Sequence, residues 1–227
     1  MLEGFNQQAD GVEVDIRLTA DKEIICHHDK NALRTTGIDR LIREMTLDEV
    51  SLLECGSWFG EAWRGEKVPE LTKILSILPK GKEIFIEVKT NEVIVPYLIE
   101  DIYHQNIDID IDKITIISFF PEVIRSVKKH NPKLKCNLLI AFDYKRIEVN
   151  EILDSVLSID ANGVGAQNHD RLNEELIGSL KEIGKSTHVW TVDSNKESDR
   201  YLKLGINSIT TNKPLFLRKH LKLLQLT

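Results

Sequence analysis

Acidic residues at alternating positions mark the N-terminal part of the chain. In the segment VEVDIRL, residues 12–18, the polar residues Glu13, Asp15 and Arg17 alternate with aliphatic ones. In a β-strand this spacing places the three polar side chains on one face. Two nearby carboxylates in a low-dielectric interior are unfavourable unless a cation or hydrogen-bond donors neutralise them. The segment alone fits a metal site and core ion pairs with lysine or arginine equally well.

A second segment, IFIEVK at residues 84–89, favours the metal site. Its alternation places Glu87 and Lys89 on one strand face. Glu13, Asp15 and Glu87, all near the C-terminal ends of neighbouring strands, would form a hard oxygen-donor site suited to Mg²⁺ or Ca²⁺. Lys89 would then contact a phosphate oxygen as a point charge. The alternative for Lys89 is an ion pair with Glu87 or Asp15 alone.

Adjacent histidines, His27 and His28, precede Asp29 in the segment CHHD. Neighbouring residues on a strand face opposite sides, so only one of the two can reach a given site. A single histidine at a strand end is usually structural, but beside a metal and a phosphate it can act as a general acid or base. Arg34 follows six residues after His28 and is a candidate to fix the loop or the histidine.

Two aromatic residues end later strand-like segments. Phe119 closes the segment IISF, and Trp190 lies in HVWTVD. A tryptophan at the end of a barrel strand is usually part of the core. At the C-terminal mouth, however, it can form an apolar wall for a small alcohol. Both residues are therefore candidates for contacts with a ligand.

The elements that must position these residues follow a repeated βα pattern, which is typical of a parallel sheet covered by helices. We predict strands at residues 12–18, 84–89, 114–119, 136–140, 163–167, 188–192 and 208–211, and helices at residues 121–130, 151–159, 173–183, 197–204 and 214–224. Residues 23–27 are predicted to form a further short strand, as an extension of the first strand or a hairpin with it above the barrel, rather than an eighth wall strand. Seven parallel strands are one short of a closed (β/α)8 TIM barrel, the fold that this α/β pattern indicates.

The segment at residues 29–80 interrupts the alternation. It contains a capping-box helix start at Thr46 and an aromatic, glycine-containing loop, GSWFGEAWRGEKVPEL. We interpret it as a small insertion after the second barrel strand, within a single domain that spans residues 1–227. Insertions at the C-terminal ends of barrel strands build the walls of active sites.

Composition excludes several classes of partner. The 227 residues carry a net charge of −6 with both signs mixed along the chain, so no basic field favours nucleic acid. No apolar run approaches the roughly 18 residues of a membrane span, and no signal region opens the chain. We expect a cytoplasmic protein. The three cysteines show no disulfide or metal spacing and are expected to be reduced core residues.

Six segments in order resemble the glycerophosphodiester phosphodiesterase family over nearly the whole chain. They are DGVEVDIRLTADKEIICHHD followed by LRTT, GSWFG with KVPEL, IFIEVK, ISF, VWTVD and GINSITTNKP. The resemblance implies a small-molecule glycerophosphodiester substrate, hydrolysed in a metal-dependent reaction to an alcohol and glycerol 3-phosphate. It also implies roles for seven residues: Glu13, Asp15 and Glu87 as ligands of Mg²⁺ or Ca²⁺, Lys89 on the phosphate, His28 as one of two catalytic histidines, and Phe119 and Trp190 on the glycerol side.

The family resemblance further implies an opening strand that ends in His-Arg-Gly and supplies the second histidine. The 227 residues start at what resembles the following helix. One interpretation is that further residues precede Met1. The other is a late start, which would make the chain a catalytically impaired barrel that binds metal and a phosphodiester in a regulatory role. Under either interpretation, we expect weak hydrolysis from these 227 residues alone, because general acid or base catalysis typically contributes about 10²- to 10⁴-fold.

An unrelated barrel enzyme, such as an aldolase, would need Lys89 as a Schiff-base nucleophile. Three neighbouring carboxylates would keep that lysine charged, so this alternative is disfavoured. The head group, the choice between Mg²⁺ and Ca²⁺, and the oligomeric state stay open at this point.

Overall fold

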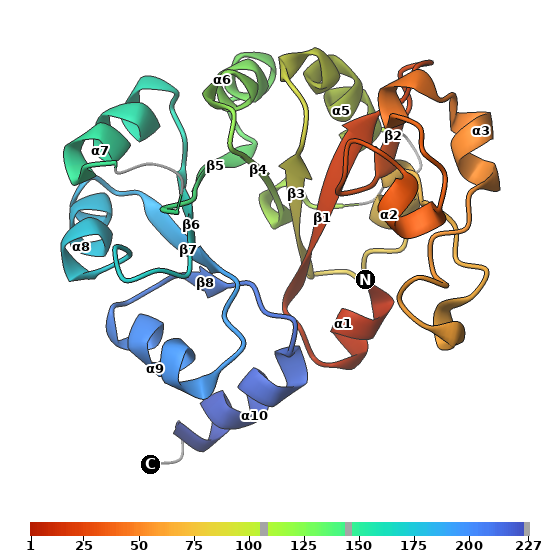
Figure 1. Ribbon diagram of the computed structural model, residues 1–227. Coiled ribbons are helices and arrows are strands. Elements are labelled where there is room, and N and C mark those ends of the chain that lie inside the picture. Colours follow the sequence, from red (N-terminus) through yellow and green to blue (C-terminus); the bar gives the residue numbers. More distant parts are fainter. Residues whose placement is uncertain (105–108, 144–146, 225–227) are drawn as a thin grey trace.

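The computed structural model describes residues 1–104, 109–143 and 147–224. Its centre is a curled eight-stranded sheet in the order β2-β1-β3-β4-β5-β6-β7-β8, with helices around the outside (Figure 1). The strands are β1 (Gly11–Leu18), β2 (Ile24–Cys26), β3 (Glu83–Val88), β4 (Ile114–Ser118), β5 (Lys135–Ile140), β6 (Gly163–Gln167), β7 (Ser186–Trp190) and β8 (Ser208–Ile209). All are parallel to their neighbours except β2, which pairs antiparallel with β1. The predicted parallel strands and the hairpin are confirmed.

The helices of the described residues are α1 (Leu2–Asn6), α2 (Leu33–Thr36), α3 (Leu47–Leu52), α4 (Leu71–Ser76), α5 (Val95–Ile102), α6 (Pro121–His130), α7 (Val149–Ser158), α8 (Glu174–Glu182), α9 (Asn195–Lys203) and α10 (Pro214–Leu224). From β3 onward, strands and helices alternate along the chain. Four 3-10 turns accompany them: η1 (Ile42–Glu44), η2 (Glu61–Trp63), η3 (Glu92–Ile94) and η4 (Ile111–Lys113). Asparagine and serine side chains begin two of these helices, since Asn173 accepts from the Leu176 N–H and Ser194 from the Glu197 N–H.

The main core lies between the sheet and this outer ring of helices. On β3, the side chains of Ile84, Ile86 and Val88 are buried in this layer, while Glu87 belongs to the opposite face of the strand. The same alternation runs along β1, where Ile16 is fully buried in the core. Because the aliphatic residues face the helices, the polar residues of these strands are directed toward the inside of the curl.

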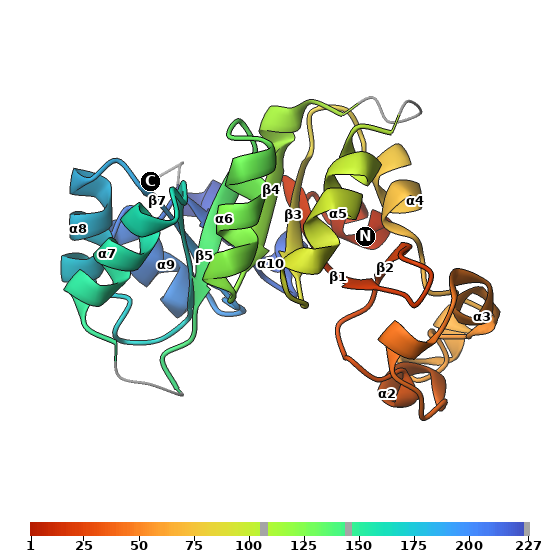
Figure 2. The ribbon, with the colours of Figure 1, turned by 90° about the horizontal axis from the view of Figure 1, so that it is seen from above.

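The segment around α2 and α3 has a small core of its own. Figure 2 shows it set off to one side of the sheet, far from α7 and α8. Its buried residues are Ile25, Ala32, Ile42, Met45, Val50 and Val68. The predicted capping box at Thr46 is present, with Glu49 as the reciprocal partner, and begins α3. Helix α4 instead packs into the main core through Leu71, Ile74 and Leu75.

The two outer edges of the parallel strands, on β1 and β8, are not paired with each other in the described part of the chain. A cavity of about 910 Å³ is lined by both edges, by α1 and α10, and by Glu13, Phe85 and His188. Arg218 on α10 forms an ion pair with Asp10 and donates a hydrogen bond to the Gln8 carbonyl at 3.1 Å. These contacts join the C-terminal helix to the segment before β1. Among the described residues, no helix is both long enough and apolar enough to cross a bilayer.

Candidate active site

Three carboxylates converge inside the curl of the sheet. Only Glu87 lies near the C-terminal end of its strand, as expected, whereas Glu13 and Asp15 lie within β1, which continues to Leu18. Parallel pairing places Asp15 directly beside Glu87, and Glu13 lies two residues earlier on the same face of β1. One oxygen from each of Glu13, Asp15 and Glu87 lies within 4.8 Å of the others. The structure therefore brings together the three residues that the strand alternation predicted.

Lys89, which follows β3, pairs with two of these carboxylates. Its Nζ lies 2.5 Å from Glu87 Oε1 and 3.2 Å from Asp15 Oδ1. Glu13 Oε1, in contrast, is buried and has no hydrogen-bond partner. One ammonium against three carboxylates leaves the cluster short of positive charge.

The pKa shifts reflect this imbalance. Burial, followed by repulsion from Asp15 and Glu87, raises the pKa of Glu13 to about 8. Burial also raises the pKa of Glu87, although Lys89 opposes the shift. Burial alone would lower the pKa of Lys89, but its contacts with Glu87 and Asp15 outweigh that effect and raise it. A lysine held charged in this way is a poor Schiff-base nucleophile, which argues against an aldolase.

The two adjacent histidines lie in different environments. His27 is buried, and both of its ring nitrogens are engaged, Nδ1 with the Asp29 carbonyl at 2.8 Å and Nε2 with Thr35 Oγ1 at 3.0 Å. His28 is 58% exposed at its side chain, and only its Nδ1 is seen to be held, 2.7 Å from Asp29 Oδ1. His28 also lies close enough to Glu87 to lower the pKa of that carboxyl in part. Of the two histidines, His28 is therefore the one whose ring is open to solvent near the carboxylates.

A short relay holds the His28 ring in place. Arg34 Nε donates to Asp29 Oδ2 at 2.5 Å, while the other oxygen of Asp29 contacts His28. The Arg34 guanidinium, helped by His28, keeps the pKa of Asp29 well below its usual range despite partial burial. Arg34 thus acts on the histidine through Asp29, the role that its spacing suggested. Its guanidinium also lies 4.9 Å from the centre of the Trp58 ring.

Arg17 has a role that the sequence reasoning missed. Its Nε and Nη2 donate to the His28 carbonyl at 3.0 and 2.7 Å, and its Nη1 donates to the Lys89 carbonyl at 3.3 Å. Arg17 therefore ties the backbone of the histidine loop to the end of β3. This role could have been predicted from the position of Arg17 on the same face of β1 as Glu13 and Asp15, because a guanidinium that points inward needs several hydrogen-bond acceptors.

The two aromatic candidates lie against each other on the same rim. Trp190 ends β7, Phe119 follows β4, and their ring centres are 5.8 Å apart in an edge-to-face arrangement of 86°. The Trp190 Nε1–H donates to the Gly165 carbonyl at 3.1 Å. At 39% exposure, Phe119 leaves an apolar surface open to a ligand.

His188, on β7, is a structural residue. Its Nδ1 contacts Ser208 Oγ at 2.7 Å, its Nε2 contacts Thr210 Oγ1 at 2.8 Å, and its ring stacks on Phe85 with centres 4.8 Å apart. Burial lowers the pKa of His188 from 6.5 to about 4. His188 is therefore neutral at pH 7 and joins β7 to β8.

The buried His188 predicts a loss of stability in mild acid. The unfolded chain binds the His188 proton below pH 6.5, whereas the folded chain binds it only near pH 4. Stability from this group is thus complete above pH 6.5 and declines as the pH falls, by about 2 kcal/mol at pH 5. Urea unfolding between pH 5 and 7 should show a smaller pH dependence in a His188→Gln variant than in the parent. A His130→Gln variant, altered at the end of α6, serves as the control, and equal slopes for parent and His188→Gln would contradict the prediction.

Comparison with known proteins gives the family. The glycerophosphoryl diester phosphodiesterase family matches residues 2–215. The chain is 30% identical over 208 residues to a glycerophosphodiester phosphodiesterase of Caldanaerobacter subterraneus, covering 91% of this chain and 83% of that protein. It is 27% identical over 223 residues to a glycerophosphodiester phosphodiesterase of Bacillus subtilis, covering 91% of this chain and 75% of the relative.

Solved structures show the same fold at lower identity. An Oleispira antarctica phosphodiesterase, in complex with its product sn-glycerol-3-phosphate, has a TM-score of 0.85 at 20% identity and covers 97% of this chain and 88% of its own. A glycerophosphodiester phosphodiesterase of Thermotoga maritima has a TM-score of 0.77 at 19% identity, covering 96% and 88%. The curled sheet and its helices are thus those of a TIM barrel, as predicted. The chain belongs to the glycerophosphoryl diester phosphodiesterase family, a family of phosphoric diester hydrolases.

Proposed function

We propose that this protein hydrolyses glycerophosphodiesters to an alcohol and glycerol 3-phosphate, using a divalent cation, Mg²⁺ or Ca²⁺, held by Glu13, Asp15 and Glu87. The observation that carries the proposal is the buried, unpartnered Oε1 of Glu13 beside two further carboxylates. Family membership and the glycerol 3-phosphate bound to the Oleispira antarctica structure support the substrate class.

The residues present fit a divalent cation. Three carboxylates face the Lys89 ammonium and the more distant Arg17 guanidinium, so negative charge is in excess when all are ionised. Burial and repulsion from Asp15 and Glu87 raise the pKa of Glu13 accordingly. Oxygen donors of this kind suit hard cations such as Mg²⁺ and Ca²⁺. When bound, the cation would polarise the phosphoryl oxygens and favour attack by an oxygen nucleophile.

The protein residues have separate tasks in this reaction. The Lys89 ammonium, already held at the cluster by Glu87 and Asp15, offers a positive charge to a phosphate oxygen. The oxygen of a water molecule bonds to phosphorus as the bond to the head-group oxygen breaks. His28, oriented through Nδ1 by Asp29, donates a proton from Nε2 to the departing alkoxide, and the proton released by the attacking water restores His28.

The apolar side of the site suits the glycerol portion of the substrate. Phe119 and Trp190 form a wall on the rim of the sheet, and carbon atoms of a small polyol can pack against such a wall. On the polar side of the site, Arg17 donates to the backbone carbonyls of both His28 and Lys89. It thereby links the two segments that carry these residues.

The direct test is hydrolysis of glycerophosphocholine, followed by the appearance of choline and glycerol 3-phosphate in the presence of Mg²⁺ or Ca²⁺. A Lys89→Met variant should lose roughly 10²-fold in kcat/KM, because a charge that stabilises the phosphoryl group is removed. Lys113→Met is the matched control, since Lys113 pairs with Glu83 at the opposite end of β3. Absence of glycerol 3-phosphate under all metal conditions would contradict the proposed reaction.

A second candidate function is binding without efficient turnover, in a regulatory role. The favouring observation is that, among the described residues near the carboxylates, His27 and His188 have both ring nitrogens engaged and only His28 is placed to transfer a proton. Saturable binding of glycerophosphocholine in the presence of metal, without product over hours, would support this function over the first.

A further inference from the structure

The backbone at the end of β7 is hydrogen-bonded to Asn168, the residue that follows the neighbouring strand β6. The Asn168 backbone N–H, just after β6, donates to the Trp190 carbonyl at 2.6 Å. The Asn168 side chain, through Nδ2, donates to the Thr191 carbonyl at 3.2 Å. Asn168 is therefore hydrogen-bonded to the carbonyls of two consecutive residues, Trp190 and Thr191.

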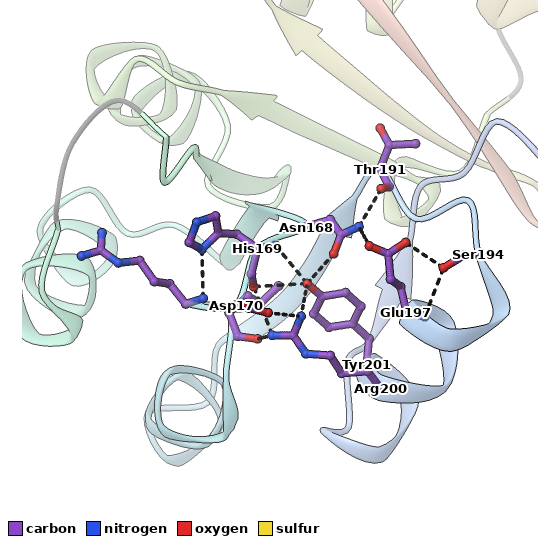
Figure 3. A network of polar contacts seen from close by, with 10 residues as sticks. Asn168, His169, Asp170, Thr191, Ser194, Glu197, Arg200 and Tyr201 are labelled. Atoms are coloured by element: carbon purple, nitrogen blue, oxygen red, sulfur yellow. Dashed lines mark hydrogen bonds and ion pairs between the residues drawn. The ribbon is translucent and has the colours of Figure 1, made fainter.

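The Asn168 side chain is itself fixed on both sides, as Figure 3 shows. Its Oδ1 accepts from the Tyr201 hydroxyl at 2.8 Å, and its Nδ2 donates to Glu197 Oε1 at 2.6 Å. Tyr201 is completely buried, and Glu197 is held in turn by Ser194 Oγ at 2.9 Å. With both ends of its amide engaged, Asn168 has one orientation available.

The partners that fix the Asn168 side chain lie on α9, which is hydrogen-bonded to the loop after β6. The Tyr201 hydroxyl also accepts from the His169 N–H at 3.1 Å. Arg200, next to Tyr201 on α9, donates to the carbonyls of His169 and Leu172 at 3.2 and 3.1 Å. Helix α9 is thus hydrogen-bonded to the loop after β6, and Asn168 extends this hydrogen-bonded network to the end of β7 (Figure 3).

The Trp190 ring depends on this backbone for its direction. Its indole N–H reaches the Gly165 carbonyl on β6, and its edge meets Phe119 across the rim. Both contacts require the main chain at Trp190 to stay beside β6. The bond from the Asn168 N–H is a backbone bond that any residue could make, so the contribution specific to asparagine is the side-chain bond to the Thr191 carbonyl.

We propose that Asn168 is a positioning residue that sets selectivity for the glycerol portion of the substrate by holding Trp190 against Phe119. The inference rests on the proposed function. Asn168 itself acts through the backbone of Trp190 and Thr191 and through the buried Tyr201. An apolar wall that contacts the same atoms before and during the reaction contributes equally to both states, so its loss raises KM and leaves kcat nearly unchanged.

The kinetic test compares Asn168→Ala with Asn173→Ala on two substrates. Asn173 begins α8 with a side-chain hydrogen bond to the Leu176 N–H, so its replacement removes a cap without reaching Trp190. We expect Asn168→Ala to raise KM for glycerophosphocholine roughly tenfold with kcat changed less than about threefold. Its kcat/KM on bis(p-nitrophenyl) phosphate, which lacks glycerol, should match the parent. Equal losses on both substrates, or the same KM in both variants, would overturn the proposal.

A second measurement is independent of turnover. Trp58→Phe and Trp63→Phe leave Trp190 as the single tryptophan of the three in the chain. In that background, Asn168→Ala should increase acrylamide quenching of Trp190 fluorescence, whereas Asn173→Ala should not. Unchanged quenching would overturn the positioning role. Increased quenching in a protein that hydrolyses neither substrate would support the role of Asn168 and place the failure in the proposed function.

Discussion

Replacing His28 with alanine is expected to lower kcat on glycerophosphocholine by about 10²- to 10⁴-fold while leaving the melting temperature unchanged. The magnitude is that of a general acid or base removed from its reaction. The unchanged stability follows from the exposure of the ring, 58% at the side chain. Within the described part of the chain, the one polar contact seen for the ring is with the neighbouring Asp29. Steady-state kinetics and thermal unfolding of the same preparation measure both quantities.

His27→Ala is the matched control, because the same substitution is made one residue earlier. His27 is buried and contacts the Asp29 carbonyl and Thr35 Oγ1, so its loss leaves buried polar groups without partners. We expect a loss of about 1–3 kcal/mol in the free energy of unfolding. Any loss of activity in His27→Ala should come mainly from disturbance of the loop that carries His28. Equal activity losses in two variants of unchanged stability would show that His28 has no special role.

Removal of divalent metal is expected to lower both stability and activity. A ligand present at 100 times its dissociation constant stabilises the native state by about 2.7 kcal/mol, which corresponds to roughly 5–10 °C in Tm for a domain of this size. The physical reason is the relief of repulsion among Glu13, Asp15 and Glu87, which are mutually close and share one lysine. EDTA should produce the shift, and excess Mg²⁺ or Ca²⁺ should reverse it.

The carboxylate variants locate the metal effect. Glu87→Gln keeps the size of the side chain but removes a ligand charge, so its Tm should respond little to EDTA. Glu83→Gln makes the same change at the start of the same strand, where the carboxylate pairs with Lys113 instead, and should respond like the parent. A Tm that ignores EDTA and added metal in both the parent and Glu87→Gln would refute the metal site.

Local pattern alone determined the strands of the sheet and the face on which each polar residue lies. The alternation in residues 12–18 and 84–89 predicted that Glu13, Asp15 and Glu87 share one side of their strands, because successive side chains on a strand point in opposite directions. Helices α6 and α10 were predicted with the bounds observed. Helix α5 was not predicted. The proline of α5 lies in the first turn, where its missing N–H is tolerated. A residue that breaks a helix in its interior therefore occurs here at the start of one.

Contacts between distant segments were decided only by the tertiary structure. The sequence showed that His27 and His28 diverge, but His27 is the structural member because the fold places Thr35 and the Asp29 carbonyl around its ring. Arg17 binds carbonyls at His28 and Lys89, positions that the chain brings together only after β1 pairs with β3. Asn168, just after β6, reaches the backbone of Trp190 and Thr191 at the end of β7, and periodicity within either strand carries no information about that contact. Periodicity reports which way a side chain points relative to its own strand, whereas the partner it meets depends on the register between strands and on the loops beyond them.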